Sequence, residues 1–191
     1  MKRKCPNYIK ITGKLLTLLV LVLALLTIEP LPLSAEAPTP REYKVKSAFL
    51  YNFVHFVDWP ASAFTSAQSP FTVGILGKNP FGADLESLNG QSIKNRKLLV
   101  KTLRSIEEAK DCQLLFISNS ERGRLLQILS ALQGIPVLTV SDIEGFAASG
   151  GMIHFVTLED KVRFEINLKE AQAVKLNLSS QLLKLARDVI K

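Results

Sequence analysis

FTVGIL, residues 71–76, is a compact apolar run of strand length, and it decides how the chain around it must fold. A turn follows at once, GKNPFG (77–82), and after it a short segment of helical character, residues 83–88. A strand without a polar face must be covered on both sides, as in a parallel sheet. The stretch therefore predicts a buried parallel strand that leads through a turn into a helix.

The same alternation continues along the chain and predicts the fold class. Further strands are expected at 97–102, 113–117 and 136–140, and further helices at 105–110 and 120–132. After residue 140 the pattern changes to a hairpin, with arms 152–158 and 162–168 joined by 159–161, and then to helices 169–174 and 180–190. We expect a single α/β domain of three layers: a mostly parallel sheet, helices on both faces, and a C-terminal antiparallel hairpin.

A strongly apolar helix precedes the first strand. Residues 45–60 read VKSAFLYNFVHFVDWP, and the apolar spacing predicts a helix over 42–57 that packs on two sides. Trp59-Pro60 ends it, because proline disfavours a helical residue before it. Asn52 is expected inside the buried stripe, where an unpartnered amide would cost about 1–3 kcal/mol.

The N-terminus has the pattern of a secretory signal peptide. A basic start is followed by fourteen uncharged residues, 15–28, and by the small-residue site Ala35-Glu36-Ala37. Fourteen residues rise about 21 Å as a helix, short of the roughly 30 Å hydrocarbon core. We expect export to the periplasm, cleavage near Ala35 or Ala37, a mature domain over 38–191, and no stable membrane insertion afterwards. The alternative is an uncleaved N-terminal anchor.

Removal of residues 1–37 changes the charge and the cysteine count. Lys and Arg fall from 24 to 19 and Asp and Glu from 17 to 15, which leaves a net charge of +4. No basic stripe with interleaved aromatic residues remains, so nucleic acid is not an expected partner. Cys5 leaves with the signal peptide, and Cys112 remains without an internal disulfide partner. It is either a buried structural thiol or a redox-sensing or intermolecular one.

Two regions are candidate interaction sites. The first is a partner surface near the end of the helix over 42–57, together with the glycine-rich segment GFAASGG (145–151). Its residues are Asn52, Phe53, Phe56, Trp59 and Phe146. The alternative is that the aromatic residues belong to the core and that 145–151 is a turn before the hairpin.

The second region is a ligand pocket at the carboxyl ends of the parallel strands, where doubly wound sheets bind ligands. Its residues are Gly77, Lys78 and Asn79 after one strand and Ser118, Asn119 and Ser120 after another. Both loops lead into helices whose N-terminal amides favour anions. The alternative is an ordinary turn at Gly77 and a helix cap at Ser120.

The residues that could support catalysis are few and scattered. His55, Cys112 and His154 are far apart in the sequence, although a zinc site needs three or four ligands. No serine lies in a G-x-S-x-G motif. We expect no catalytic residues, no metal and no cofactor, and therefore no enzyme.

Six blocks of this chain resemble the YfiR family of small exported bacterial regulators. They are residues 45–60, FTVGILGKNPFG (71–82), DCQLLFIS (111–118), PVLTVSDIEGFAASGGMIHFV (136–156), KVRFEINL (161–168) and SSQLLKLAR (179–187). The resemblance implies a periplasmic α/β domain that represses a membrane-bound diguanylate cyclase through its periplasmic sensor domain, and so controls cyclic di-GMP and biofilm. Some members carry several cysteines and respond to redox state, whereas this chain keeps only Cys112 after export.

Alternatives to that function remain open. A periplasmic small-ligand-binding domain that serves a receptor or transporter is the second hypothesis, and a secreted enzyme is the third. The apolar first helix and the apolar C-terminal segment also favour a homodimer.

Overall fold

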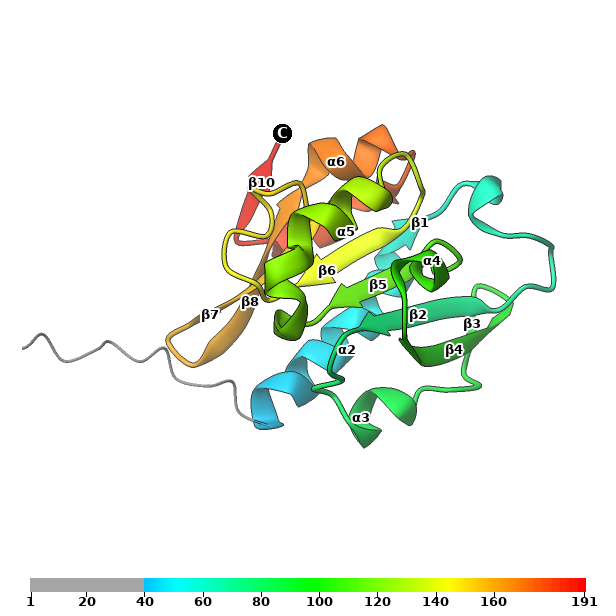
Figure 1. Ribbon diagram of the computed structural model, residues 1–191, viewed down its shortest axis with the longest axis horizontal. Helices are drawn as coiled ribbons and strands as arrows, with labels where there is room; N and C mark the ends of the chain where they lie inside the picture. Colours follow the sequence, from blue (N-terminus) through cyan, green and yellow to red (C-terminus); the bar gives the residue numbers. More distant parts are fainter. Residues whose placement is uncertain (1–39) are drawn as a thin grey trace, which may run out of the picture. The chain divides into compact units, whose positions relative to one another are not determined.

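A curled eight-stranded sheet lies at the centre of residues 40–191, the part of the chain that the computed structural model describes (Figure 1). Its strands are β2 (Phe71–Leu76), β3 (Ser92–Ile93), β4 (Arg96–Leu103), β5 (Leu114–Ile117), β6 (Leu138–Ser141), β7 (Ile153–Leu158), β8 (Lys161–Asn167) and β10 (Asp188–Ile190). Their order across the sheet is β10-β8-β7-β6-β5-β2-β4-β3. The strands from β4 to β7 in this order are parallel, β8 is antiparallel to β7, and β10 is parallel to β8. The predicted mostly parallel sheet with a C-terminal hairpin is confirmed.

The strand order reverses between β2 and β5. From β2 the chain crosses to β4 on one side, and from β4 it returns to β5 on the other side of β2. In doubly wound sheets ligands bind beyond the carboxyl ends of the strands at such a reversal. The loops after β2 and β5 therefore lie where the sequence pattern expected a pocket.

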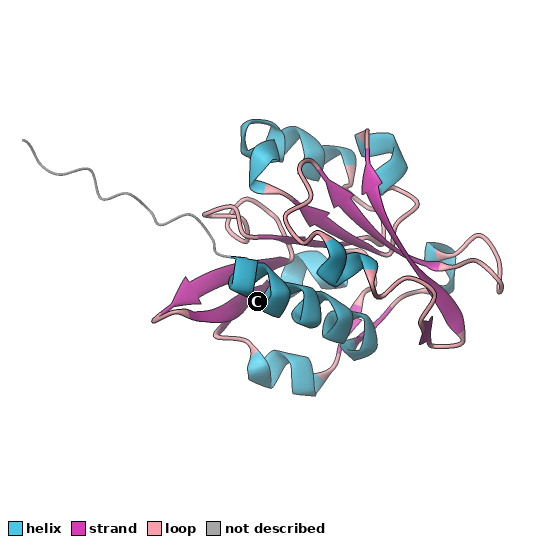
Figure 2. Cartoon of the chain, turned by 90° about the horizontal axis from the view of Figure 1, so that it is seen from below, coloured by secondary structure: helices cyan, strands magenta, loops and turns pink. Residues whose placement is uncertain are grey.

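Helices cover both faces of the sheet and create two cores (Figure 2). One face carries α2 (Pro40–Phe56), α3 (Ala83–Glu86) and α7 (Ser180–Leu185), and the other carries α4 (Ile106–Ala109), the 3-10 helix η2 (Asn119–Arg124) and α5 (Leu125–Ala131). A short helix, α6 (Leu168–Ala173), follows β8 directly. On the α2 side Phe53 stacks on Phe155 and meets the edge of Phe164, with centroids 5.7 and 5.1 Å apart. These rings fasten α2 to the β7–β8 hairpin.

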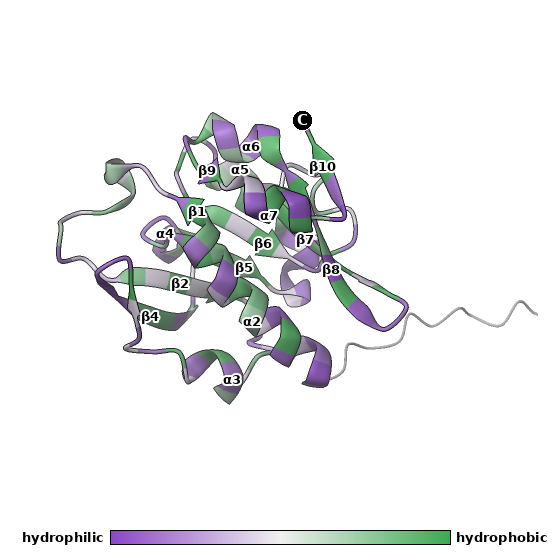
Figure 3. Ribbon diagram, turned by 180° about the vertical axis from the view of Figure 1, so that it is seen from behind, coloured by the Kyte–Doolittle hydropathy of each residue, from purple (hydrophilic) through white to green (hydrophobic). Residues whose placement is uncertain are grey.

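The expected burial of Asn52 is wrong. α2 packs on the sheet through Leu50, Phe53 and Val54, each fully buried, whereas Asn52 lies on the opposite, exposed face. The helix lies on the outside of the sheet, so one of its faces meets water (Figure 3). The polar Asn52 therefore needs no buried partner.

The predicted helix over 180–190 is also wrong in its second half. α7 ends at Leu185, and the backbone of Ala186 is extended, with φ −67° and ψ 143°. Arg187 then donates its backbone N–H to the Phe164 carbonyl at 2.8 Å, and β10 pairs with β8. The outer edge of β8 offers unpaired backbone groups, and their hydrogen bonds outweigh the helical spacing of the C-terminal residues. For the same reason β8 is an inner strand, with β7 on one side and β10 on the other.

Pairing between distant segments produces two elements that the sequence pattern did not indicate. β1 (Val57–Asp58) directly follows α2 and pairs antiparallel with β9 (Asn177–Leu178).

The predicted helix over 120–132 is divided in the structure, because η2 forms its first part and α5 its second. The predicted signal peptide, residues 1–37, lies outside the described residues.

Candidate functional site

Trp59 is fixed at the amino ends of β2 and β5. Its indole Nε1 donates to the backbone oxygen of Gln113 at 2.8 Å. Its ring meets Phe71 edge to face, with centroids 4.8 Å apart, and the Lys94 ammonium lies 6.0 Å from its centroid. The side chain is half-buried, so part of the ring contributes to the surface while the rest is held in place.

The loop that follows Trp59 is attached to the same end of the sheet. The buried Gln113 amide accepts from the Thr72 backbone at 2.8 Å and donates to the Ala63 carbonyl at 2.6 Å. Arg96 donates to the carbonyls of Ser66 and Ser69 and lies 3.8 Å from the centroid of the Phe64 ring. These contacts hold loop 59–70 over the amino ends of the parallel strands.

The predicted partner surface is divided by the fold. Asn52 is exposed, and Phe56 and Trp59 are half-buried, so these three reach the surface. Phe53 and Phe146 are fully buried and pack in different cores. Phe146 lies under Gly151, where any added Cβ would collide with its ring. The partner surface therefore stays a prediction, and Asn52, Phe56 and Trp59 are the residues that could carry it.

The outward face of α2 has no Asp, Glu, Lys or Arg between Val45 and His55, and the exposed Arg41 and Lys44 lie in the turn before it. Val45, Ala48, Asn52 and His55 are exposed along it, and Tyr51 is half-buried with its ring 4.8 Å from that of His55. Exposed surfaces of soluble proteins usually carry many charged side chains, and depletion of charge is typical of the centres of interfaces. We call the residues Val45, Ala48, Tyr51, Asn52 and His55 the outward face of α2.

The loops predicted to form a ligand pocket do meet at the carboxyl ends of β2 and β5. Ser120 Oγ accepts from the backbone N–H of Lys78 at 3.0 Å, and Ser118 caps η2 by accepting from the Ser120 N–H. Gly77 has φ +92°, and a side chain there would collide with Ser120. Asn79 turns inward on its own loop and accepts from the backbone N–H two residues on, at 2.9 Å. Asn119 is exposed beside them. Lys78, Ser118 and Ser120 thus bond to one another, whereas Asn79 and Asn119 bond to residues on their own segments. A ligand at this place stays a prediction.

A buried charge cluster lies close by, and the sequence analysis did not predict it. Lys46, 2% exposed, places its ammonium 2.6 Å from Glu42 and 2.7 Å from Asp142, which directly follows β6. Tyr43 donates its hydroxyl to the same Asp142 oxygen at 2.9 Å. Burial, and next the Asp142 charge, raise the pKa of Tyr43 well above its ordinary value. A lysine beside the apolar positions of α2 was the available signal, since a buried lysine must have a partner.

This cluster fastens the first turn of α2 to the carboxyl end of the sheet. Glu42 also accepts from Thr157, near the tip of the β7–β8 hairpin, at 2.9 Å. The other Asp142 oxygen, Oδ1, is buried and has no hydrogen-bond partner within residues 40–191. The cluster positions the helix whose outward face is described above.

Cys112 is enclosed between β2 and α4. It is 2% exposed, and its Sγ lies 3.6 Å from the Glu108 carbonyl. Burial raises the pKa of its thiol from 9.0 to about 12. A thiol of that pKa is almost entirely protonated at neutral pH and is a poor nucleophile. These facts favour the structural interpretation, and a redox role stays a prediction. Within the described part of the chain, no three His, Cys, Asp or Glu side chains gather closely enough to hold a metal ion.

The fold and these surfaces define a class: a doubly wound α/β domain with a well-anchored helix whose outward face is poor in charge from Val45 to His55. The particular family is shown by comparison with family models. The chain belongs to the YfiR/HmsC-like family, whose model matches residues 43–187, from the first turn of α2 to the residue before β10. That family is periplasmic and regulatory rather than enzymatic.

Other comparisons add little. No curated protein matches this chain. A solved structure described as the ABC domain in complex with L-Trp from Streptococcus pneumonia shares 14% identity, with a TM-score of 0.46, over 63% of this chain and 55% of that one. At such a TM-score the likeness says nothing about function. None of the helices described from residue 40 onward is long and apolar enough to span a membrane.

Proposed function

We propose that this protein is a periplasmic regulator that binds the periplasmic domain of a membrane diguanylate cyclase, or of a similar signalling protein, and represses it. The observation that carries the proposal is the family match over residues 43–187, which spans nearly all of the described domain. The outward face of α2 supports it, because charge depletion on a rigid helix suits contact with another protein. Repression follows if the regulator binds the inactive conformation of the cyclase more tightly than the active one.

The contact is proposed to use the outward face of α2 together with Phe56 and Trp59, which continue it toward the amino ends of β2 and β5. The stacking of Phe53 on Phe155 holds α2 toward its C-terminal end, and the ion pair of Lys46 with Asp142 holds it toward its N-terminal end. The outward face of α2 is therefore preorganised. A preorganised surface loses little conformational entropy on binding. A second copy of this chain is the other occupant that such a face could take.

The test compares two substitutions in a strain that lacks the gene. Asn52→Arg places a charge on the outward face of α2, and Gln127→Arg places the same charge on the exposed side of α5, on the other face of the sheet. Deletion should raise cyclic di-GMP, Gln127→Arg should restore the low level, and Asn52→Arg should fail to do so while still folding. No change of cyclic di-GMP on deletion would reject the function, and full restoration by Asn52→Arg would reject the surface.

A second measurement separates a partner from a second copy. Light scattering of the purified protein gives its mass in solution. A dimer that Asn52→Arg splits would assign the face to self-association, whereas a monomer that captures the cyclase domain would assign it to the partner.

We also propose export, and mass spectrometry of the periplasmic protein should find an N-terminus just after Ala35 or Ala37.

A further inference from the structure

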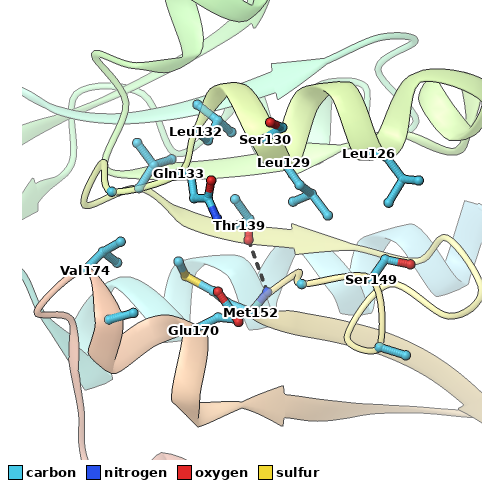
Figure 4. Close-up of a pocket in the computed structure, with 15 residues that line it drawn as sticks. Leu126, Leu129, Ser130, Leu132, Gln133, Thr139, Ser149, Met152, Glu170 and Val174 are labelled. Atoms are coloured by element: carbon cyan, nitrogen blue, oxygen red, sulfur yellow. Dashed lines mark hydrogen bonds between the residues drawn. The ribbon is translucent and has the colours of Figure 1, made fainter.

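A cavity of about 570 Å³ lies between α5, β6, the segment 145–151 and α6 (Figure 4). Its volume falls within the range of about 300–1,000 Å³ that small-molecule sites occupy. Polar and apolar groups contribute about equally to its wall, and the exposed Leu126 is one of the lining residues. The principal apolar side chains are Leu129, Leu132, Val137, Met152 and Val174. It is separate from the loops after β2 and β5 and from the outward face of α2.

Hydrogen bonds hold the walls of the cavity in place. Thr139 Oγ1 accepts from the Met152 backbone at 3.1 Å, which joins β6 to the start of β7. The Asn167 amide, 7% exposed, donates to the Ala147 carbonyl at 3.0 Å and accepts from the Glu170 N–H at 3.2 Å. One buried side chain thus ties the segment 145–151 to the first turn of α6. The cavity is preformed, so a ligand need not order its walls.

The ionisable groups that residues 40–191 place in the lining of the cavity are acidic only. Glu170 is the one ionisable residue among the described residues that line the cavity, and no lysine, arginine or histidine is among them. Its carboxylate makes no ion pair or hydrogen bond with any residue from 40 to 191. Figure 4 shows this carboxyl group beside Met152, on the cavity side of α6, while the Gln133 amide points toward Thr139 from the end of α5. A carboxylate that has no cationic neighbour in the lining attracts a ligand cation and disfavours a ligand anion.

We propose that this cavity binds a small amine with an apolar body. The ammonium group meets the Glu170 carboxylate, and the apolar body lies against the leucine, valine and methionine side chains. Gln133 and Thr139 add hydrogen bonds for a polar substituent. A zwitterion or an organic acid is disfavoured, because no cation in the lining meets a ligand carboxylate. The proposal goes beyond the regulatory function and does not rest on it, since binding is measured on the isolated protein.

The test uses three probes of similar shape, and isothermal titration calorimetry measures the affinity of each. The protein is expressed from the complete gene and purified in the form that the cell produces. The probes are 2-phenylethylamine, 2-phenylethanol and 3-phenylpropanoate, which carry a cation, a neutral hydroxyl and an anion. The amine should bind about tenfold more tightly than the alcohol, because a charge-assisted hydrogen bond adds about that much affinity. The acid should bind most weakly.

Two variants locate the binding. Glu170→Gln should lower amine affinity about tenfold, to that of the alcohol, while Glu107→Gln, on the exposed side of α4, should leave it unchanged. Ala173→Phe should fill the cavity and abolish binding of the amine and the alcohol while the circular dichroism spectrum stays native. Absence of binding by every probe at millimolar concentration, equal affinity for the cation and the anion, or unchanged amine binding in Glu170→Gln would overturn the proposal.

Discussion

Replacement of Lys46 by methionine removes one charge from the cluster at the start of α2 and keeps most of the side-chain volume. Lys46 is 2% exposed and lies 2.7 Å from Asp142, whose side chain is 8% exposed. Without the ammonium group, Asp142 stays buried with the Tyr43 hydroxyl as its hydrogen-bond donor within residues 40–191. Glu42 loses an ion pair at 2.6 Å in the same step.

The expected cost is large for this single change. Removal of one partner from a buried ion pair costs about 3–5 kcal/mol, because the remaining charge is left without compensation. Whole domains are stable by only about 5–15 kcal/mol. For a domain of this size we expect the melting temperature to fall by about 10 °C. The control is Lys44→Met, two residues earlier on the exposed side of α2. It should change the free energy of unfolding by less than about 0.5 kcal/mol.

Urea unfolding followed by circular dichroism measures both variants, and a double-mutant cycle with Asp142→Asn measures the pair itself. The double variant should lose at least about 1 kcal/mol less than the sum of the two single variants, because each single change strands a group that the double change removes. A loss below about 1 kcal/mol for Lys46→Met, or strict additivity in the cycle, would refute the view that this cluster anchors α2.

Three further predictions concern the interior of the sheet. The pKa of the Cys112 thiol is raised to about 12 in the folded protein. As the pH rises above the ordinary pKa of a thiol, Cys112 therefore ionises in the unfolded state before it does so in the folded state. The free energy of unfolding should fall by about 2 kcal/mol between roughly pH 9 and 11. Cys112→Ala should flatten that slope in urea titrations at each pH, and an equal slope would contradict the burial argument. Gly74→Val should destabilise by about 1–3 kcal/mol, because a Cβ there would lie 2.7 Å from Leu103 and 2.8 Å from Cys112; a melting temperature equal to that of the parent would be the contrary result. Gln113→Leu should cost about 1–3 kcal/mol, since it strands the buried Thr72 N–H, and amide exchange at Thr72 should accelerate; unchanged protection there would argue against it.

Local patterns predicted most of the parallel sheet. The run FTVGIL coincides with β2, and the apolar runs near 114–117 and 138–141 coincide with β5 and β6. Such strands are buried on both faces, so their composition alone marks them. The turn at 159–160 was also visible, because a short polar segment between two alternating arms predicts a hairpin.

The candidate sites were less predictable, because burial depends on which face of an element meets the sheet. Phe53 and Asn52 are neighbours in the chain, yet one is fully buried and the other exposed. The loops after β2 and β5 lie side by side, and the hydrogen bond between Lys78 and Ser120 joins residues 42 positions apart in the chain. A ligand between them stays a prediction. The cavity beside Glu170 draws its walls from α5, β6 and α6, and no local pattern connects these segments.

Periodicity by itself determined the α/β class and the parallel strands, because both depend on the order of apolar and polar residues along the chain. The family resemblance rested instead on six particular blocks of sequence. Only the tertiary structure decided that β10 joins β8, that Lys46 meets Asp142, and that the side of α2 with Ala48 and Asn52 is the one that meets solvent. These features depend on contacts between residues that are distant in the chain, and a free energy of pairing or burial exists only once both partners have been brought together.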